Sequence, residues 1–271
     1  MKKSLTFLIV LIIIPFGLFV AQNRLRISNA LKRRLYVFQK ERILLPSEVA
    51  LATTSPSPTT WQATKTPVSA TPYLPSPSPS LKSEVYLEAP FISQAPLKHW
   101  DAYHEELCEE AAILIVAGSK GKIAPQSKKE MEEELSEIVN FEKGLFNGRW
   151  QSTNAEEIAR VLQEKFDIKA EVVENFSILD LKQKLSEGHL IIAPTYGRAL
   201  GNPFYTPPGP IYHALVLKGY RGNQFITHDP GTNQTGENYL YDERVLFKAI
   251  HDWPGKSEDV PRSPRRVIVI Y

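Results

Sequence analysis

The hydrophobic pattern divides the chain into three parts. Leu5 to Ala21 is apolar except at Thr6, Pro15 and Gly17, whereas residues 52–80 consist largely of Thr, Ser and Pro. From Leu81 onward, apolar and polar residues recur with the periods of helices and strands. This last part predicts one globular domain, with enough residues for one sizeable core.

Within the domain, the clearest helical signal is the uninterrupted apolar run Ala111–Ala117. We expect a short helix there that begins near Cys108, is buried nearly all round and is stopped by Gly118. Three further helices are indicated by capping residues or periodicity, and a fourth by the last apolar stretch before the C-terminal strand. The first begins after Ser127, with Glu130 as its capping partner, and the second begins after Thr153, with Glu156 as its partner. The third covers Leu179–Ser186 and the fourth covers Asp242–Trp253.

Extended segments dominate the second half of the domain. We expect strands at Val85–Ile92, Ala170–Val173, Leu190–Pro194, Ile211–Tyr220, Gln224–Asp229 and Val267–Tyr271. Helices first and antiparallel strands afterwards indicate an α+β fold.

The N-terminal apolar segment, residues 1–22, predicts either a membrane anchor or a removed signal peptide. Its length of about 17 apolar residues lies at the lower edge of a membrane span. An uncleaved anchor is favoured because Phe19-Val20-Ala21 makes a poor cleavage site. Residues 23–51 are basic with interspersed apolar positions, which is typical either of an amphipathic helix on anionic lipid or of a helix with a solvated charged face.

The Pro-, Ser- and Thr-rich segment and the folded domain that follows it are separated by a change in composition. Residues 52–83 are expected to be a disordered linker and residues 84–271 the folded domain. A Pro-rich tether of this kind favours a domain on the extracytoplasmic side of the cell membrane, or a secreted one. The basic residues that follow the anchor favour the opposite orientation.

Charge and cysteine content exclude several classes of function. Residues 1–80 hold ten Lys or Arg and two Asp or Glu, which leaves 22 basic against 28 acidic residues in the remainder. An acidic domain without a basic stripe argues against nucleic acid as a partner. A single cysteine permits no internal disulfide, and no metal-ligand spacing or cofactor motif is evident, so neither a metal nor a cofactor is expected.

That single cysteine, Cys108, is the first candidate for chemistry. The first turn of a helix favours a thiolate, the nucleophilic form of cysteine. Glu105, Glu106, Glu109 and Glu110 oppose the thiolate, so a cationic partner is required. The alternative is a cysteine that serves only as a small buried hydrophobic residue.

The predicted hairpin supplies that partner. Alternation along Ile211–Lys218 places His213 on an apolar face, where a histidine is either a catalyst or a satisfied core residue. If Gly219 pairs with Asn223, Asp229 lies directly across from His213 and holds its imidazole. Asp229 is otherwise the terminator of its strand.

Five motifs in order resemble the peptidase C39-like family, papain-fold relatives of the double-glycine leader peptidases. They are Phe91-Ile92-Ser93-Gln94-Ala95-Pro96 with Trp100-Asp101, Cys108-Glu109-Glu110-Ala111, Tyr212-His213-Ala214-Leu215-Val216-Leu217-Lys218-Gly219-Tyr220, His228-Asp229-Pro230-Gly231-Thr232, and Ala249-Ile250-His251-Asp252-Trp253. The resemblance implies a papain-like cysteine peptidase fold, with Cys108 as nucleophile, His213 as general base and Asp229 as the orienting residue. It implies that Gln94 donates its side-chain amide to the oxyanion.

The expected function is therefore hydrolysis of peptide or related amide bonds in a protein or cell-wall peptide by a membrane-tethered domain. Two alternatives remain open: an inactive papain-like module that binds peptides, and a transpeptidase or amidase with the same triad. No phosphate loop of an export ATPase is present, so cleavage of a co-exported leader is not implied. The loop from Gly197 to Pro210 either lines the cleft or is a plain connection.

Overall fold

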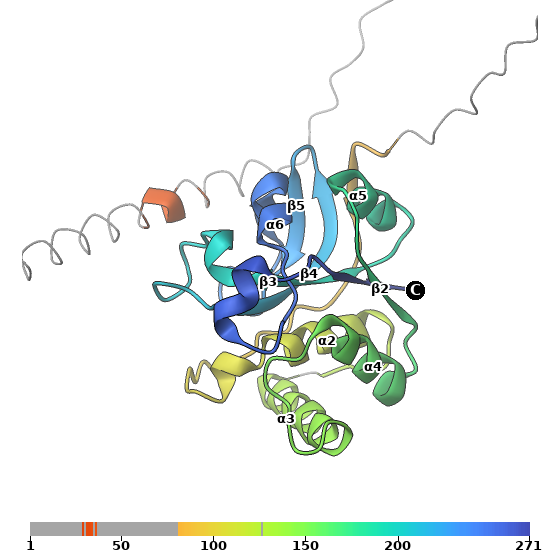
Figure 1. Ribbon diagram of the computed structural model, residues 1–271, viewed down its shortest axis with the longest axis vertical. Helices are drawn as coiled ribbons and strands as arrows, with labels where there is room; N and C mark the ends of the chain where they lie inside the picture. Colours follow the sequence, from red (N-terminus) through yellow and green to blue (C-terminus); the bar gives the residue numbers. More distant parts are fainter. Residues whose placement is uncertain (1–28, 30, 35, 37–80, 126) are drawn as a thin grey trace, which may run out of the picture.

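A seven-stranded sheet runs through the middle of the molecule, with helices on both faces (Figure 1). The protein is described from a computed structural model over residues 29, 31–34, 36, 81–125 and 127–271. The strands are β1 (Glu84–Tyr86), β2 (Ala170–Val173), β3 (Ile191–Tyr196), β4 (Tyr212–Arg221), β5 (Gln224–His228), β6 (Tyr239–Asp242) and β7 (Val267–Ile270). Their order is β2-β7-β3-β4-β5-β6, with β1 on β4, and every pairing is antiparallel.

The helices form two groups, one for each face of the sheet. They are α2 (Cys108–Ser119), α3 (Lys128–Leu145), α4 (Ala155–Phe166), α5 (Ile178–Ser186) and α6 (Glu243–Ala249), with the short 3₁₀ helices η1 (His104–Glu106), η2 (Gly197–Leu200) and η3 (Ser257–Arg262). The core under α2, α3 and α4 includes Ile192 and Val216, and the core under α5 and α6 includes Ile191 and Leu217. Neighbouring strand residues thus face opposite cores. The predicted mixture of helices and antiparallel strands is confirmed.

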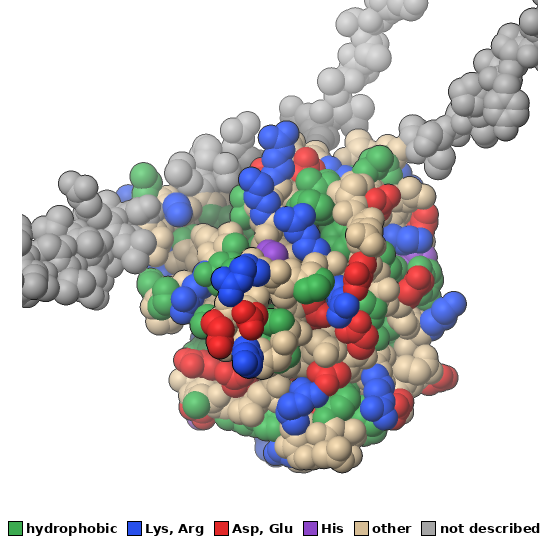
Figure 2. Space-filling view, viewed as in Figure 1, with side chains coloured by type: hydrophobic (Ala, Val, Ile, Leu, Met, Phe, Trp, Pro, Cys, Tyr) green, Lys and Arg blue, Asp and Glu red, His purple; other side chains and the backbone are tan. Residues whose placement is uncertain are grey.

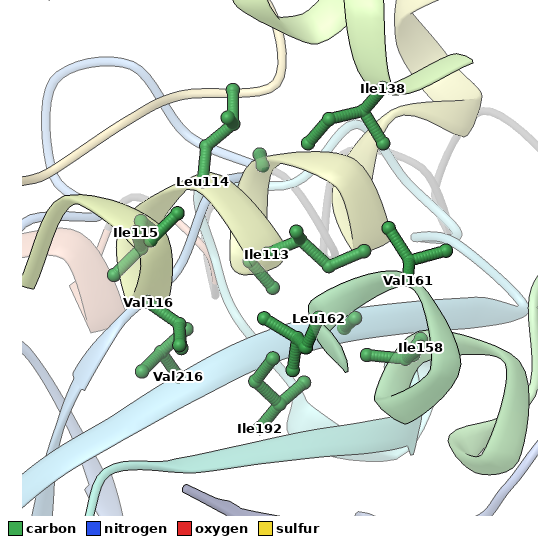
Figure 3. Packing of buried hydrophobic residues seen from close by; sticks show 14 of the residues in the cluster. Ile113, Leu114, Ile115, Val116, Ile138, Ile158, Val161, Leu162, Ile192 and Val216 are labelled. Atoms are coloured by element: carbon green, nitrogen blue, oxygen red, sulfur yellow. The ribbon is translucent and has the colours of Figure 1, made fainter. Parts of the chain in front are cut away.

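Helix α2 lies at the centre of the first core. All residues from Cys108 to Ala117 are buried, as the apolar run predicts. Figure 3 shows Ile113 packed toward Leu162 of α4 and Ile192 of the sheet. Each such side chain contributes about 1.5–3 kcal/mol of transfer free energy, so this helix is held by packing on every side.

Two predicted helix ends are wrong. Gly118 lies inside α2 and not at its end, because the glycine makes room for Pro90, whose Cγ would lie 2.5 Å from an added Cβ. The helix α4 begins one residue later than predicted, since Asn154 and Glu157 form its capping box in place of Thr153 and Glu156. The predicted Ser127 cap of α3 is confirmed: its side chain accepts from the backbone N–H of Glu130.

Strand lengths also differ from the pattern. The strand predicted at Val85–Ile92 is shortened to β1, whose last residue, Tyr86, is also the last to pair with β4. The helix predicted at Asp242–Trp253 is likewise shortened to α6. Strand β6 was not predicted, although Tyr239 and Tyr241 alternate with the period of a strand.

The described residues include no helix that combines the length and the apolar character needed to cross a bilayer. The anchor predicted for residues 1–22 lies outside the described residues, as does most of the segments 23–51 and 52–83. On the face of the domain seen in Figure 2, acidic and basic side chains are interspersed.

Candidate active site

One cleft of about 860 Å³ gathers residues from both halves of the molecule. Gln94, Glu105, Glu106, Cys108 and Glu109 line it from the helical half, and residues 204–213, Gly231 and Trp253 line it from the sheet half. The loop before β4 therefore does line the cleft. Three of the four predicted site residues, Gln94, Cys108 and His213, share this cavity.

Cys108 is the first residue of α2, as the sequence predicts. Its Sγ accepts from the backbone N–H of Ala214, at 3.4 Å, and donates to Oε2 of Glu109, at 2.8 Å. Burial raises the pKa of this thiol well above its usual range, and the charge and hydrogen bond of Glu109 raise it further. The side chain of Cys108 is thus a neutral thiol turned toward a carboxyl group.

Glu109 is itself buried, with about 2% of its surface exposed. Burial raises the pKa of its carboxyl to about 7, while the hydrogen bond from Cys108 acts in the opposite direction. Glu109 therefore changes charge near neutral pH beside the candidate nucleophile. Beneath it, burial raises the pKa values of Glu110 and Glu142, whose carboxyls contact each other between α2 and α3.

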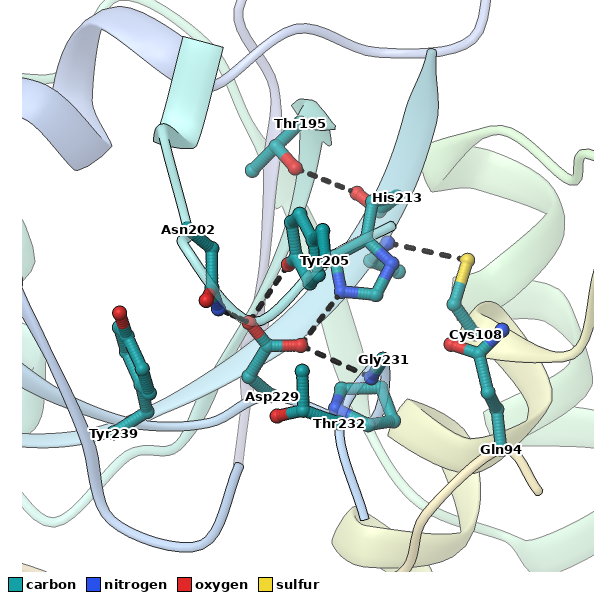
Figure 4. A network of polar contacts seen from close by, with 12 residues as sticks. Gln94, Cys108, Thr195, Asn202, Tyr205, His213, Asp229, Gly231, Thr232 and Tyr239 are labelled. Carbon is teal, nitrogen blue, oxygen red and sulfur yellow. Dashed lines mark hydrogen bonds and ion pairs between the residues drawn. The ribbon is translucent and has the colours of Figure 1, made fainter. Parts of the chain in front are cut away.

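His213 lies at the start of β4, next to the Cys108 helix. Figure 4 shows its imidazole between Cys108 and Asp229. The ring Nε2 lies 2.9 Å from Oδ1 of Asp229, and the backbone carbonyl of His213 accepts from Oγ1 of Thr195 at 2.8 Å. Because Nε2 is used by Asp229, Nδ1 is the ring nitrogen left to face the cleft.

Asp229 is completely buried, yet its carboxylate is surrounded by donors (Figure 4). Its Oδ1 also accepts from the backbone N–H of Gly231, at 3.0 Å. Its Oδ2 accepts from Asn202 Nδ2 at 3.0 Å, from the Tyr205 hydroxyl at 2.7 Å and from the Tyr241 hydroxyl at 2.6 Å. Burial alone would raise the pKa of Asp229, but the charge of His213 and these hydrogen bonds hold it below its usual range.

The predicted register of the hairpin is wrong, although the contact that it was meant to explain exists. Arg221 pairs with Gln224 across a two-residue turn in which Gly222 has φ +54°. A bulge between Leu217 and Gly219 then shifts the pairing, so that Val216 lies opposite His228. The carboxylate of Asp229 follows the end of β5 and reaches the imidazole diagonally instead of from the directly opposed position.

Gln94 is buried in the cleft, but its amide is occupied. Its Nε2 donates to the backbone carbonyls of His104, at 2.8 Å, and Glu105, at 3.2 Å, while its Oε1 has no hydrogen-bond partner among the described residues. Gln94 thus fastens the segment that leads into α2. Its role as an oxyanion donor stays a prediction.

Two further histidines near the site, His228 and His251, have backbone partners. His228 Nε2 lies 3.0 Å from the carbonyl of Ala89, and His251 Nδ1 lies 2.7 Å from that of Ser263, so both pair with backbone. Within the described part of the chain, no group of three or more His, Cys, Asp or Glu is arranged to hold a metal ion.

Sequence reasoning missed the three side chains that hold Asp229 at Oδ2. Asn202 and Tyr205 come from the loop after η2, and Tyr241 comes from the unpredicted strand β6. The alternation of Tyr239 and Tyr241 is the one signal that points to that strand. No local pattern indicates that the loop residues turn inward.

The chain is similar in structure and in sequence to known proteins. The structure resembles a crystal structure of a candidate C39-like peptidase from Bacillus anthracis, with 15% sequence identity and a TM-score of 0.44, over 69% of this chain and 97% of the other. No curated protein matches the sequence. The model of the Peptidase_C39 like family matches residues 86–256, which include every residue that lines the cleft except Arg33 and Ser257. The chain therefore belongs to the peptidase C39-like family.

Proposed function

We propose that the protein is a cysteine peptidase in which Cys108 is the nucleophile, His213 the general base and Asp229 the residue that orients it. The observation that carries this proposal is that the only cysteine of the sequence lines one cleft with His213, whose imidazole is paired with the buried Asp229. Membership of the peptidase C39-like family agrees with hydrolase chemistry. The sequence, the family and the geometry thus favour the same reaction class.

The reaction begins with a proton transfer. The Cys108 thiol turns from Glu109 toward Nδ1 of His213, which takes the proton and becomes an imidazolium held by Asp229. The thiolate attacks the carbonyl carbon and forms a tetrahedral intermediate. The imidazolium then gives its proton to the leaving amine, the C–N bond breaks, and a thioester remains on Cys108. Water, deprotonated by His213, releases the acid and restores the thiol.

The oxyanion needs donors at the same place. The backbone N–H of Cys108 belongs to the first turn of α2, where N–H groups have no partner within the helix. The Gln94 amide is the second candidate, and it must exchange one of its two backbone carbonyls for the oxyanion. A contact of this kind contributes about 3 kcal/mol to a comparable reaction.

The setting of the enzyme is also a proposal. The apolar residues 1–22 and the Pro-rich residues 52–83 support a domain tethered to the cell membrane on its extracytoplasmic side, acting on proteins or cell-wall peptides. Membrane fractionation tests the tether. Recovery of the full-length protein in the soluble fraction would argue against it.

The test of the chemistry is the rate at which iodoacetamide alkylates Cys108 as a function of pH. Because the chain has one cysteine, the intact mass of the full-length protein reports that site alone. We expect faster alkylation than of a free thiol near neutral pH, and loss of that excess in His213→Ala. Ordinary thiol behaviour, unchanged in His213→Ala, would contradict the proposal and favour the inactive peptide-binding module, which the raised thiol pKa already makes the second candidate.

Hydrolysis and acyl transfer share every step as far as the thioester. Incubation with a peptide library and an added amine acceptor separates them by product mass. Acid products indicate a peptidase, and amide products with the acceptor indicate a transpeptidase.

A further inference from the structure

Residues far upstream of the domain pack beside the active-site cleft. The described residues between 29 and 36, which are Asn29, Leu31 to Arg34 and Tyr36, are helical and are drawn in red in Figure 1. We call them the N-terminal segment. Five of its residues are of intermediate or high exposure, whereas Tyr36 is only 9% exposed. The segment therefore contacts the domain through one face.

Tyr36 attaches the segment to the sheet half. Its ring stacks on Tyr239 of β6, with centroids 4.3 Å apart and planes 12° from parallel. It meets the ring of Phe204 edge-on at 5.7 Å, and its hydroxyl accepts from the backbone N–H of Leu240 at 3.3 Å. An aromatic ring with two aromatic partners and a satisfied hydroxyl is a typical anchor of a specific contact.

Arg33 carries the segment to the cleft. Its Nε donates to the carbonyl of Pro203 at 2.8 Å, and its guanidinium carbon lies 5.3 Å from the centre of the Phe204 ring. Arg33 is also part of the cleft lining, beside the loop that precedes β4. No carboxylate among the described residues is recorded within ion-pair distance of it. A guanidinium has five N–H donors, and only the Nε donor of Arg33 has a hydrogen-bond partner among the described residues.

The cleft is thereby charged differently on its two sides. On the helical half, which carries Cys108, the three carboxyls of Glu105, Glu106 and Glu109 outnumber the one cation, Lys98, among the described residues that line the cleft. On the sheet half, Arg33 lines the cleft beside Phe204. A substrate carboxylate is repelled by the first side and attracted by the second. Arg is the side chain that best matches a carboxylate, because its planar N–H groups bind both oxygens.

We propose that the N-terminal segment forms one wall of the substrate cleft, held there by Tyr36, and that Arg33 binds a carboxylate of the peptide substrate. The part that concerns the substrate rests on the proposed function. The part that concerns the wall does not, since it needs only that the segment stays docked.

Two alkylating reagents of nearly equal size test both parts on the full-length protein. Iodoacetate carries a carboxylate and iodoacetamide does not, and both react with Cys108. We expect Arg33→Ala to lower the ratio of the iodoacetate rate to the iodoacetamide rate by about twofold, the effect of one charge acting across a water-filled cleft. Arg33→Lys should keep the ratio, and Tyr36→Ala should lower it as far as Arg33→Ala does.

Arg34 supplies the matched control, because it is an exposed arginine next to Arg33 with no recorded contact to the cleft. An equal ratio in Arg33→Ala and Arg34→Ala would overturn the proposal. So would an unchanged ratio in Tyr36→Ala, since the segment would then not need its anchor. Salt at about 0.5 M should remove the difference between the native chain and Arg33→Ala.

The two proposals fail in different ways. If Cys108 alkylates like an ordinary thiol, the proposed function is contradicted, but the rate ratio at about pH 9 still reports whether Arg33 attracts an anion. If only the ratio fails, the peptidase proposal stands and the wall does not.

Discussion

Replacing Glu109 by glutamine should lower the pH at which Cys108 alkylates. The Glu109 carboxylate accepts a hydrogen bond from the thiol at 2.8 Å and repels the thiolate that the proposed reaction needs. Glutamine removes the charge but keeps an oxygen that can accept from the thiol, so the geometry of the pair is preserved. The direction of the change is fixed by charge alone: without a neighbouring anion, the thiolate forms more easily.

The magnitude follows from the same contact. At an effective dielectric constant of about 20, two unit charges separated by the 2.8 Å of this contact repel each other by about 6 kcal/mol, which is an upper limit. Each pKa unit corresponds to about 1.4 kcal/mol. Glu109, with its pKa of about 7, is ionised at the higher pH at which the thiol loses its proton, but cleft water screens the pair. We therefore expect the midpoint to fall by about 1–2 pH units.

The assay is the alkylation rate of the full-length protein by iodoacetamide between about pH 5 and pH 10, followed by intact mass. Glu105→Gln makes the same chemical change on an exposed side chain of the same cleft and should leave the midpoint nearly unchanged. A midpoint that stays constant in Glu109→Gln would refute the electrostatic argument. A midpoint that rises would show that Glu109 takes the thiol proton itself and acts as a base.

Three further predictions concern the framework. Tyr241→Phe removes the 2.6 Å hydrogen bond to Asp229, and urea unfolding at pH 7 should show a loss of about 1.5–3 kcal/mol; an unchanged free energy of unfolding would contradict it. Burial raises the pKa of the Glu142 carboxyl to about 8. The contribution of this carboxyl to the free energy of unfolding is therefore complete below its pKa in the unfolded chain and is lost as pH rises toward 8. Glu142→Gln should reduce the fall in melting temperature between pH 5 and pH 8.5, whereas Glu133→Gln, an exposed change on the same helix, should not. Gly219→Ala would place its Cβ 2.1 Å from a backbone carbonyl of β1, and thermal unfolding should reveal a cost of about 1–3 kcal/mol.

The parts of the fold that could be predicted are those with a strong local signal. The apolar run after Cys108 identified a buried helix, and the Ser127 cap identified the start of the next one. The approximate position of the His213 hairpin also followed from alternation and from the glycine in its turn. In each case, the residues that determine the element lie within the element.

The parts that could not be predicted depend on contacts between distant segments. The bulge near Gly219 changed the hairpin register, and the glycine is required because the backbone of β1 passes close to it. An interior strand glycine was a usable sign of such a contact. Asn202 and Tyr205 reach Asp229 from a loop, where no periodicity directs side chains inward. The hydrogen bond from Cys108 to Glu109 likewise depends on rotamers within a packed core, not on spacing.

The site joins residues of helix α2 to residues of the sheet on which that helix packs, so the proposed chemistry depends on the alignment of these two layers. Cys108 belongs to the helical core, whereas His213 and its partner belong to the sheet, and the bond from the Ala214 N–H to Sγ, at 3.4 Å, is already long. A slip of about 1 Å between the helix and the sheet would break such a bond, yet it would expose almost none of the core that they share. Heating or mutation should therefore abolish the proposed activity at a temperature below that at which the domain unfolds.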